Sequence, residues 1–285
     1  MISATRYSAI AQINRQAKLG EEIARAQTEI STGKKVQKAS DDPISAARIA
    51  ELRRVQADQV TWSRNIQTAQ SVAAQVDTQM GNMADIFNRV KELTLAGRSD
   101  SASPADRAAM VLELQSLRTA LSNISTATTP TGQPLFPTDA PLQISVSSTV
   151  RLAATAQRST VFEGIAYTHG TGDLDDVIGT AIDAISTDDA TARRAAADIA
   201  LSDIDVAVQH VTDQRAAQGV RAQQLDVAAD TLEGVSTQLA EERSSLEDTD
   251  VAAAIMKLNA KTLTLQAAQA AFAKVNSNTL FDFLR

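Results

Sequence analysis

Cysteine is absent from this chain of 285 residues. Disulfides, thiolate zinc sites and cysteine nucleophiles are therefore excluded. The chain has two histidines, His169 and His210, and they lie far apart in the sequence. A metal site built on several histidines is not expected, whereas a carboxylate site remains open at this point.

Glycine, proline and aromatic residues are also scarce, at 11 Gly, 6 Pro and 3% aromatic residues. A compact core of this size normally relies on large side chains, and much of the 44% hydrophobic content here is alanine. The composition therefore favours long uninterrupted helices that pack in thin layers.

No apolar run approaches the roughly 18 residues of a membrane span, so membrane insertion is not expected. The N-terminal residues lack the continuous apolar stretch of a secretory signal peptide. The chain is therefore either cytoplasmic or exported by a route that uses no such signal. The net charge of −7 is concentrated in the middle of the chain, between basic ends, which does not suit nucleic-acid binding.

Catalytic and cofactor motifs are missing as well. The sequence contains no Gly-rich phosphate loop, no G-x-S-x-G and no H-E-x-x-H. Adjacent carboxylates such as Glu241 and Glu242 point about 100° apart on a helix, so they do not converge on one substrate. We expect neither an enzyme nor a cofactor.

Residues 44–96 carry the strongest periodic signal, a stripe at alternating spacings of three and four that is typical of a helix. A helix of this length would extend on the order of 80 Å. It should end near Gly97, and a second helix should begin with Ser103 as N-cap and Pro104 at its first position, ending near Ala127. The stripe comprises Leu52, Val55, Gln59, Trp62, Ile66, Ala69, Ala73, Val76, Met80, Met83, Phe87 and Val90.

Four of the six prolines fall within 128–141, and apolar and polar residues alternate from Leu142 to Val146. This pattern predicts a small β-containing insert, after which Asp173 or a neighbour caps a short helix. From about Asp188 the helical stripe returns and runs to Leu246. Arg215 and Gln218 interrupt it, and we expect these two side chains to face a specific neighbour.

The two ends repeat the helical pattern more weakly. Residues 10–30 predict an amphipathic helix that stops around Gly33, and 251–276 form a stripe diluted by Thr262, Gln269 and Asn276. The final residues TLFDFLR are apolar and aromatic, which is unusual for a chain end in water.

Asp41 and Asp42 in KASDDPISAARIA suggest either a metal loop or the start of a helix. Calcium-type loops require further oxygen ligands in alternation, and Pro43, Ile44 and Ser45 do not provide them. Pro43 suits a first helical position and Asp42 the N-cap before it. We therefore predict a helix cap with no chemistry.

These segments resemble the bacterial flagellin family. ISTGKKVQKASDDPISAARIAELRR (30–54) is similar to the N-terminal signature of flagellins and their hook-associated relatives. RAAQGVRAQQLD (215–226) and EDTDVAAAIMKLNAKTLTLQAAQAAFAKV (247–275) resemble their C-terminal helices. SNISTATTPTGQPLF (122–136) and the LFDFL ending resemble the hook-associated branch, whereas FNRVKELTLAG (87–97) resembles filament flagellin.

The resemblance implies a mainly α fold: an elongated antiparallel bundle of long helices with a small β-containing insert and terminal helices that pair as a coiled coil. The expected division is 1–38 with 251–285 as polymerisation segments, 39–127 with 181–250 as a rod, and 128–180 as the insert. The ends are expected to be disordered in the monomer and to become ordered on assembly.

The implied function is a self-assembling, non-enzymatic junction protein between hook and filament, extracellular and exported by the flagellar type III route without a cleaved signal peptide. Its partners would be copies of itself, hook-associated proteins, flagellin, and an export chaperone at the C-terminal segment. Filament flagellin is the alternative within the family. A surface adhesin or carbohydrate-binding module that uses the insert is the alternative outside it.

The residues expected to act are of three kinds. Asp42 and Pro43 form the helix cap. The rod contacts are Arg89, Glu92, Leu93, Arg215 and Gly219. The assembly interface comprises Ile10, Ile13, Ile23, Ile30, Ile255, Leu258, Leu265, Phe272, Leu280, Phe281 and Phe283.

Overall fold

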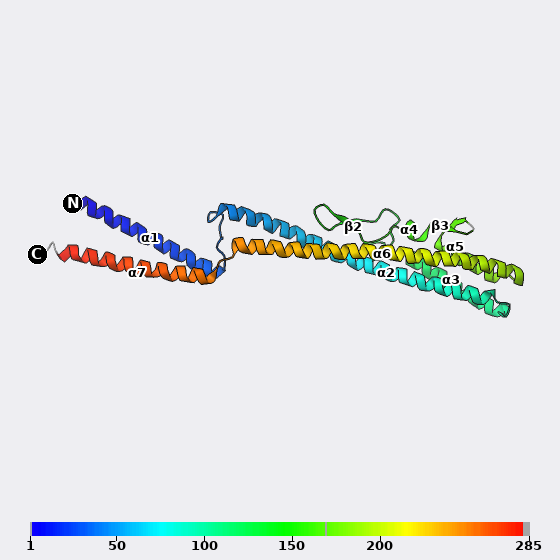
Figure 1. Cartoon of the computed structure of the whole chain (residues 1–285). Helices are drawn as coiled ribbons and strands as arrows, with labels where there is room; N and C mark the ends of the chain where they lie inside the picture. The colour runs from blue at the N-terminus through cyan, green and yellow to red at the C-terminus, as the bar shows by residue number, and fades with distance from the viewer. Residues whose placement is uncertain (1, 169, 282–285) are drawn as a thin grey trace. The chain divides into compact units, whose positions relative to one another are not determined.

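The computed structural model describes residues 2–168 and 170–281; within the first nine residues it describes only the side chain of Tyr7, and at the C-terminal end it describes side chains up to residue 274. The helices are α1 (Ile2–Thr32), α2 (Pro43–Arg98), α3 (Pro104–Ser125), α4 (Arg158–Phe162), α5 (Leu174–Ser186), α6 (Ala190–Glu247) and α7 (Val251–Phe281). The strands are β1 (Gln143–Ser145), β2 (Arg151–Ala153), β3 (Ile165–Tyr167) and β4 (Gly170–Gly172). The predicted mainly α fold with a small β-containing insert is confirmed (Figure 1).

The chain forms two compact units, Met1–Ala57 with Ser236–Arg285 and Asp58–Val235. Helices α2 and α6 each contribute residues to both units. The first, the terminal unit, contains α1 and α7. The second, the central unit, contains α3, α4, α5 and the four strands.

The long stripe predicted on α2 is the buried face of that helix. Ten of its twelve residues are buried, and Val55 and Trp62 are half-buried. The spacing of three and four keeps these side chains on one side of a helix. A single continuous helix can therefore bury the whole stripe.

The core of the central unit lies among α2, α3, α5 and α6, with Phe87, Leu114, Ile178 and Ile204 fully buried. Burial of each such side chain contributes about 1.5–3 kcal/mol. Gly97 allows a close approach of α2 to α5, because a Cβ at this position would lie 2.8 Å from Cγ1 of Ile185.

Arg215 and Gln218 of α6 face specific neighbours, as predicted. Arg215 Nε lies 2.9 Å from Asp77 Oδ1 on α2. Gln218 is fully buried, and its Nε2 donates a hydrogen bond of 2.8 Å to the carbonyl oxygen of Ala154. The polar interruption of the stripe therefore connects α6 to α2 and to the insert.

The predicted β-containing insert is built from two short antiparallel hairpins. β1 pairs with β2, and β3 pairs with β4. Phe136 and Phe162 pack edge to face with ring centroids 5.0 Å apart, which anchors the loop after α3 on α4. Asp173 is the N-cap of α5, as predicted.

Two predicted helix starts have the expected geometry. Ser103 Oγ accepts a hydrogen bond of 3.1 Å from the Asp106 N–H, and Pro104 follows it as the first residue of α3. Asp42 Oδ1 accepts hydrogen bonds of 3.1 Å from the N–H groups of Ile44 and Ser45 at the start of α2. The Ser45 hydroxyl also donates to Asp42, and together these bonds hold the pKa of the Asp42 carboxyl below its ordinary value.

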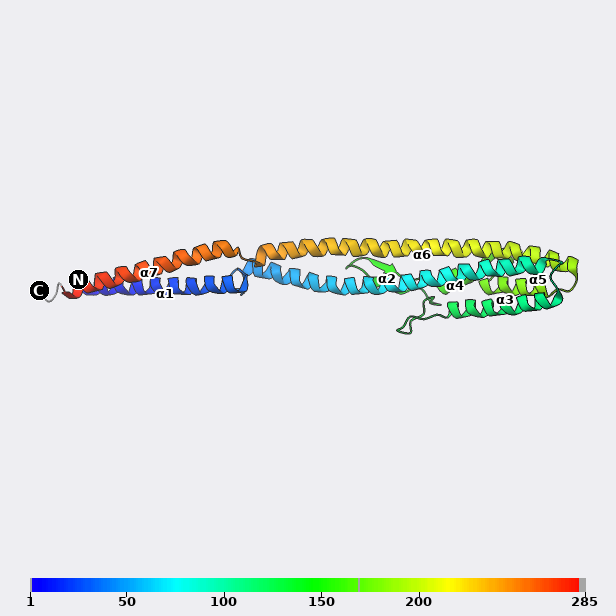
Figure 2. The same cartoon turned by 90° about the horizontal axis from the view of Figure 1, so that it is seen from below.

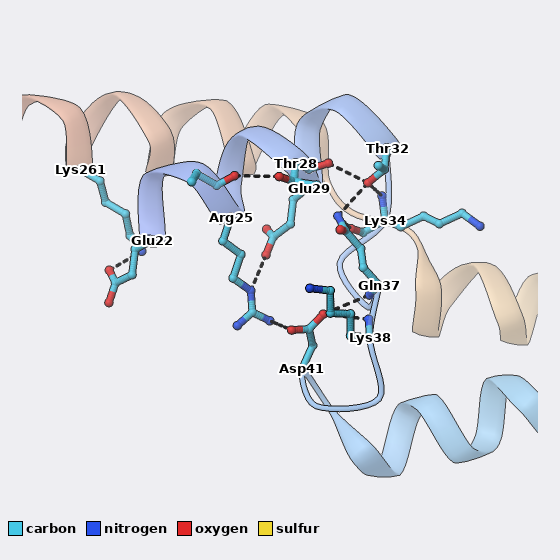
Figure 3. A network of polar contacts seen from close by, with 11 residues as sticks. Glu22, Arg25, Thr28, Glu29, Thr32, Lys34, Gln37, Lys38, Asp41 and Lys261 are labelled. Atoms are coloured by element: carbon cyan, nitrogen blue, oxygen red, sulfur yellow. Dashed lines mark hydrogen bonds and ion pairs between the residues drawn. The ribbon is translucent and has the colours of Figure 1, made fainter. Parts of the chain in front are cut away.

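Asp41 does not join Asp42 in one site. Its Oδ2 accepts hydrogen bonds from the N–H groups of Lys38 (3.0 Å) and Gln37 (3.3 Å), and its Oδ1 lies 3.4 Å from Arg25 of α1 (Figure 3). One carboxylate therefore caps α2 and the other closes the preceding loop against α1. The adjacent carboxylates have separate structural roles.

Replacing Asp42 with Ala should release the two N–H groups that its carboxylate accepts from and fray the first turn of α2. We expect amide exchange at Ile44 and Ser45 to accelerate roughly fivefold and the thermal midpoint to fall. Asp42→Asn is the matched control, because an Asn side chain caps nearly as well. Equal exchange rates in the Ala and Asn variants would contradict the cap.

Candidate functional site

The terminal helices α1 and α7 lie side by side (Figure 1, Figure 2), as predicted for the two ends of the chain. A few polar contacts join them. Lys261 Nζ lies 2.7 Å from Glu22 Oε2 (Figure 3), and Gln16 Nε2 donates a long hydrogen bond of 3.5 Å to the Ala268 carbonyl. Among the described side chains of α1 and α7, only Ala26 and Ala254 are buried. Small alanine side chains remove little apolar area from water, so the pair has almost no core of its own.

The predicted assembly residues remain largely exposed or half-buried. Ile10, Ile13 and Ile255 are 57%, 53% and 43% exposed. Leu280 and Phe281 lie in α7, but their side chains, like Phe283 as a whole, fall outside the described residues. The half-buried members are Ile23, Ile30, Leu258, Leu265 and Phe272.

Further exposed apolar residues were missed by the sequence analysis. Tyr7 on α1 is 80% exposed, and Met256 and Leu263 on α7 are 66% and 67% exposed. A spacing of four, three and four residues connects Met256, Ala260, Leu263 and Ala267, all of which are exposed. They form a second apolar row on α7, separate from the row that contains Leu258 and Leu265. The residues of this second row are visible in the sequence, but a helix that is apolar on several sides has a weak periodicity. A search for a single stripe therefore misses the second row.

The connection between the terminal helices and the long helices is organised around Glu247, at the end of α6. Its side chain is only 5% exposed. Glu247 Oε1 forms an ion pair with Lys34 and lies 2.7 Å from Arg53 Nη2, while Oε2 lies 3.7 Å from Arg243 Nε. Three cations from the end of α1, from α2 and from α6 thus surround one carboxylate.

Backbone hydrogen bonds close the same connection. The Lys35 N–H donates to the Glu247 carbonyl oxygen at 2.8 Å, and the Thr249 N–H donates to the Gly33 carbonyl oxygen at 2.9 Å. Gly33 adopts a φ of +69°, which favours glycine at the end of a helix. The two segments that leave α1 and enter α7 are therefore held together as a short antiparallel bridge, which fixes where the terminal pair begins.

The pKa of the Glu247 carboxyl lies below its ordinary value of 4.5, because the Lys34 ammonium donates to it and the Arg53 guanidinium lies close by. A carboxyl with a depressed pKa stabilises the fold above its ordinary pKa, and that contribution is lost as the pH falls through the folded-state value. The connection should therefore weaken in acid.

The residues predicted as rod contacts lie within the central unit. Arg89 Nε lies 2.7 Å from Glu113 Oε1 on α3, Arg89 Nη1 lies 2.8 Å from Glu92 Oε2, and Leu93 is buried. Gly219 is exposed, and a Cβ placed there would meet no atom within 4 Å. Apart from Gly219, these residues make contacts within the central unit. Leu93 belongs to its core, and the others form ion pairs on its surface.

Chemistry of other kinds finds little support in the described part of the chain. No group of three or more His, Asp or Glu side chains there could hold a metal ion. No helix among the described residues is long and apolar enough to cross a membrane. The polar depression of about 310 Å³ beside the insert has charged walls, but its Arg158 and Asp175 already pair with Glu163 and Arg118.

Replacing Glu247 with Gln should remove the central charge while keeping the volume. We expect the free energy of unfolding of the terminal unit to fall by about 1–2 kcal/mol at pH 7, because the half-exposed cations can be hydrated again. Amide exchange at Lys35 and Thr249 measures this loss directly. The difference from the native chain should disappear as the pH falls below 4.5, the ordinary pKa of the carboxyl.

Glu242→Gln is the matched control, since Glu242 pairs with Arg48 at 2.7 Å but its side chain is 38% exposed. An exposed pair contributes little, so this variant should exchange like the native chain. Equal effects of the two substitutions, or a difference that persists in acid, would argue against Glu247 as the organising charge.

Comparison with known proteins finds relatives that cover both ends of the chain. Residues 4–139 match the model of the bacterial flagellin N-terminal helical region, and residues 201–284 match that of the bacterial flagellin C-terminal helical region. The chain is 25% identical over 253 residues to the flagellar filament 30.7 kDa core protein of Treponema maltophilum, covering 87% of this chain and 86% of that protein. It is 32% identical over 115 residues to flagellar hook-associated protein 3 of Escherichia coli, covering 38% of this chain and 34% of that protein.

The fold agrees with these matches. The crystal structure of flagellar hook-associated protein 3 from Legionella pneumophila superposes with a TM-score of 0.60 at 14% identity, covering 70% of this chain and 98% of that one. The crystal structure of Xanthomonas campestris FlgL gives a TM-score of 0.59 at 17% identity, covering 68% and 99%. The two family matches together include most of the chain and both terminal helices, so the chain belongs to the bacterial flagellin family of structural flagellar proteins.

Proposed function

We propose that this chain assembles with copies of itself and with other flagellar proteins through α1 and α7, and that it serves as the junction between hook and filament. The observation that carries the proposal is the apolar surface of α7, where Ile255, Met256 and Leu263 are exposed on more than one side. A helix that is apolar on several sides is stable when neighbours surround it.

The exposed apolar side chains of α1 and α7 support assembly through these helices. Large exposed apolar patches mark interaction sites, and α1 exposes Tyr7, Ile10 and Ile13 in addition to the exposed residues of α7. Among its described side chains the pair buries only two alanines, so docking against equivalent helices would remove far more apolar area from water than the pair removes alone. We accordingly propose that α1 and α7 are disordered in the free chain outside the bridge at 33–35 and 247–249, and that they become ordered on assembly.

The choice of a junction role is supported by the hook-associated protein 3 of Escherichia coli, which matches at 32% identity. The chain spans about a third of that relative's length, so the role is carried over as a proposal. Filament flagellin is the second candidate, because the filament core protein of Treponema maltophilum matches over 87% of this chain.

The route and surroundings follow from the same proposal. We place the chain outside the cell, exported unfolded by the flagellar type III route without a cleaved signal peptide, with an export chaperone on the C-terminal segment. Absence of cysteine is compatible with passage through a narrow channel, because no disulfide can form on the way.

Deletion of the gene should separate junction from filament. Cells that lack a junction protein should make hooks, carry no filament and release unpolymerised flagellin, which electron microscopy and the culture medium would show. Cells that lack a filament subunit should instead retain the hook and release no flagellin of this type. Long filaments grown from the purified chain alone after seeding would contradict the junction role and favour the second candidate.

Replacing Leu263 with Asp should block assembly without unfolding the free chain, since Leu263 is 67% exposed in it. We expect at least a tenfold loss of the chain from sheared flagella, with an unchanged circular dichroism spectrum. Leu142→Asp is the matched control, because Leu142 in the insert is 77% exposed and lies outside the terminal helices. Native incorporation of the Leu263 variant would argue against α7 as an assembly surface.

A further inference from the structure

Helix α6 carries a second apolar row that no part of the chain covers among the described residues. Val220, Val227 and Val235 are 59%, 54% and 41% exposed, and their spacing of seven and eight residues places them on one side of the helix. Valine is a weaker helix former than alanine because its branched side chain loses rotamer freedom. Three valines on an exposed helix face therefore suggest that a partner buries this row in a complex.

This row forms one wall of an open apolar groove of about 610 Å³ in the central unit. Trp62 of α2, the only tryptophan of the chain, lies on another wall. Val150 and Leu152, from the β1–β2 hairpin, close the third side. A row of helical valines opposite an aromatic side chain suits an amphipathic helix that lays its apolar face into a groove.

The groove contains one buried polar group that has no partner. Gln59 of α2 is only 5% exposed, yet its Oε1 accepts no hydrogen bond from the described residues. Buried amide groups nearly always have partners, and an unsatisfied one destabilises the fold. Gln59 lines the groove, so a small rotation of its side chain would present this oxygen to a donor on an occupant. A single amide at a core position of packed helices also fixes their register.

The size of the groove limits what occupies it. Fourteen residues line it, whereas a stable interface between independent proteins uses roughly 20–30 residues on each side. The groove alone is therefore too small to hold two free chains together. It suits a contact that forms after another interface has already brought the partners close and raised their effective concentration.

We propose that this groove receives a helix of a second copy of the same chain within the flagellar assembly, and that Gln59 sets the register of that contact. The proposal rests on the proposed function, in which the terminal helices bring the copies together. The groove then determines how neighbouring central units align, while the terminal helices provide most of the binding.

Photochemical cross-linking tests the identity of the occupant. A photoreactive amino acid replaces Gln224, an exposed residue that lines the groove, in the full-length chain assembled on flagella. The expected product has twice the mass of the chain, and its peptides come from the same sequence. The matched position is Val60, which is 52% exposed on α2 and does not line the groove. A product with a different flagellar protein, or none from position 224, overturns the proposal.

Two substitutions test the contribution of the groove. Val227→Asp should leave the spectrum of the free chain unchanged, because Val227 is exposed there, and should reduce incorporation into flagella at least tenfold. Val60→Asp should incorporate like the native chain. Gln59→Leu should raise the thermal midpoint of the free chain by removing the unsatisfied amide, yet lower its incorporation.

The failures of the two proposals are distinguishable. If the native chain does not enter flagella, the proposed function falls. If the native chain and Val227→Asp enter equally, or if Gln59→Leu enters as well as the native chain, only the assignment of the groove falls. In assembled native material, emission of Trp62 should move to shorter wavelength and resist acrylamide quenching, and unchanged emission would also overturn the groove contact.

Discussion

The buried carboxylate of Glu247 is the interaction on which the arrangement of the terminal helices depends. It lies where α1 ends, α6 ends and α7 is about to begin, and cations from the segment after α1, from α2 and from α6 converge on it. One carboxylate with several partly exposed partners remains satisfied if a single partner moves away, because the others stay within reach. The backbone bridge between 33–35 and 247–249 adds direction to this electrostatic centre. The terminal unit is thus held firmly at its junction and weakly along α1 and α7, where the buried side chains among the described residues are two alanines.

The central unit follows the opposite principle. Phe87, Leu114 and Ile178 belong to a core of large buried side chains, and the ion pairs of Arg89 and Arg215 connect helices across its surface. Its surface also carries the apolar groove beside Trp62. The central unit offers an apolar groove, and the terminal helices offer several exposed apolar rows. Under the proposals above, the terminal helices would hold copies together and the central units would align them.

Much of this fold could be predicted from the sequence because its periodicities are long. The α2 stripe, the caps at Asp42 and Ser103 and the start of α5 after Asp173 depend on local spacing, which one sequence displays. Glu247 could not be recognised, because Lys34 lies 213 residues away and a lone glutamate at a helix end has no distinguishing pattern. The valine row on α6 was also missed. It lies beside the stronger stripe of Leu225 and Leu232, and only the structure shows that nothing in the described chain covers it.

The bridge between Gly33–Lys35 and Glu247–Thr249 also has a temporal consequence. The partner of the first helix is synthesised more than two hundred residues after it, so the N-terminal segment cannot complete its junction until most of the chain has been made. Contacts so distant in sequence form slowly, because a long loop must close before they stabilise anything. The bridge at the base of the terminal helices is therefore among the last contacts to form as the chain folds.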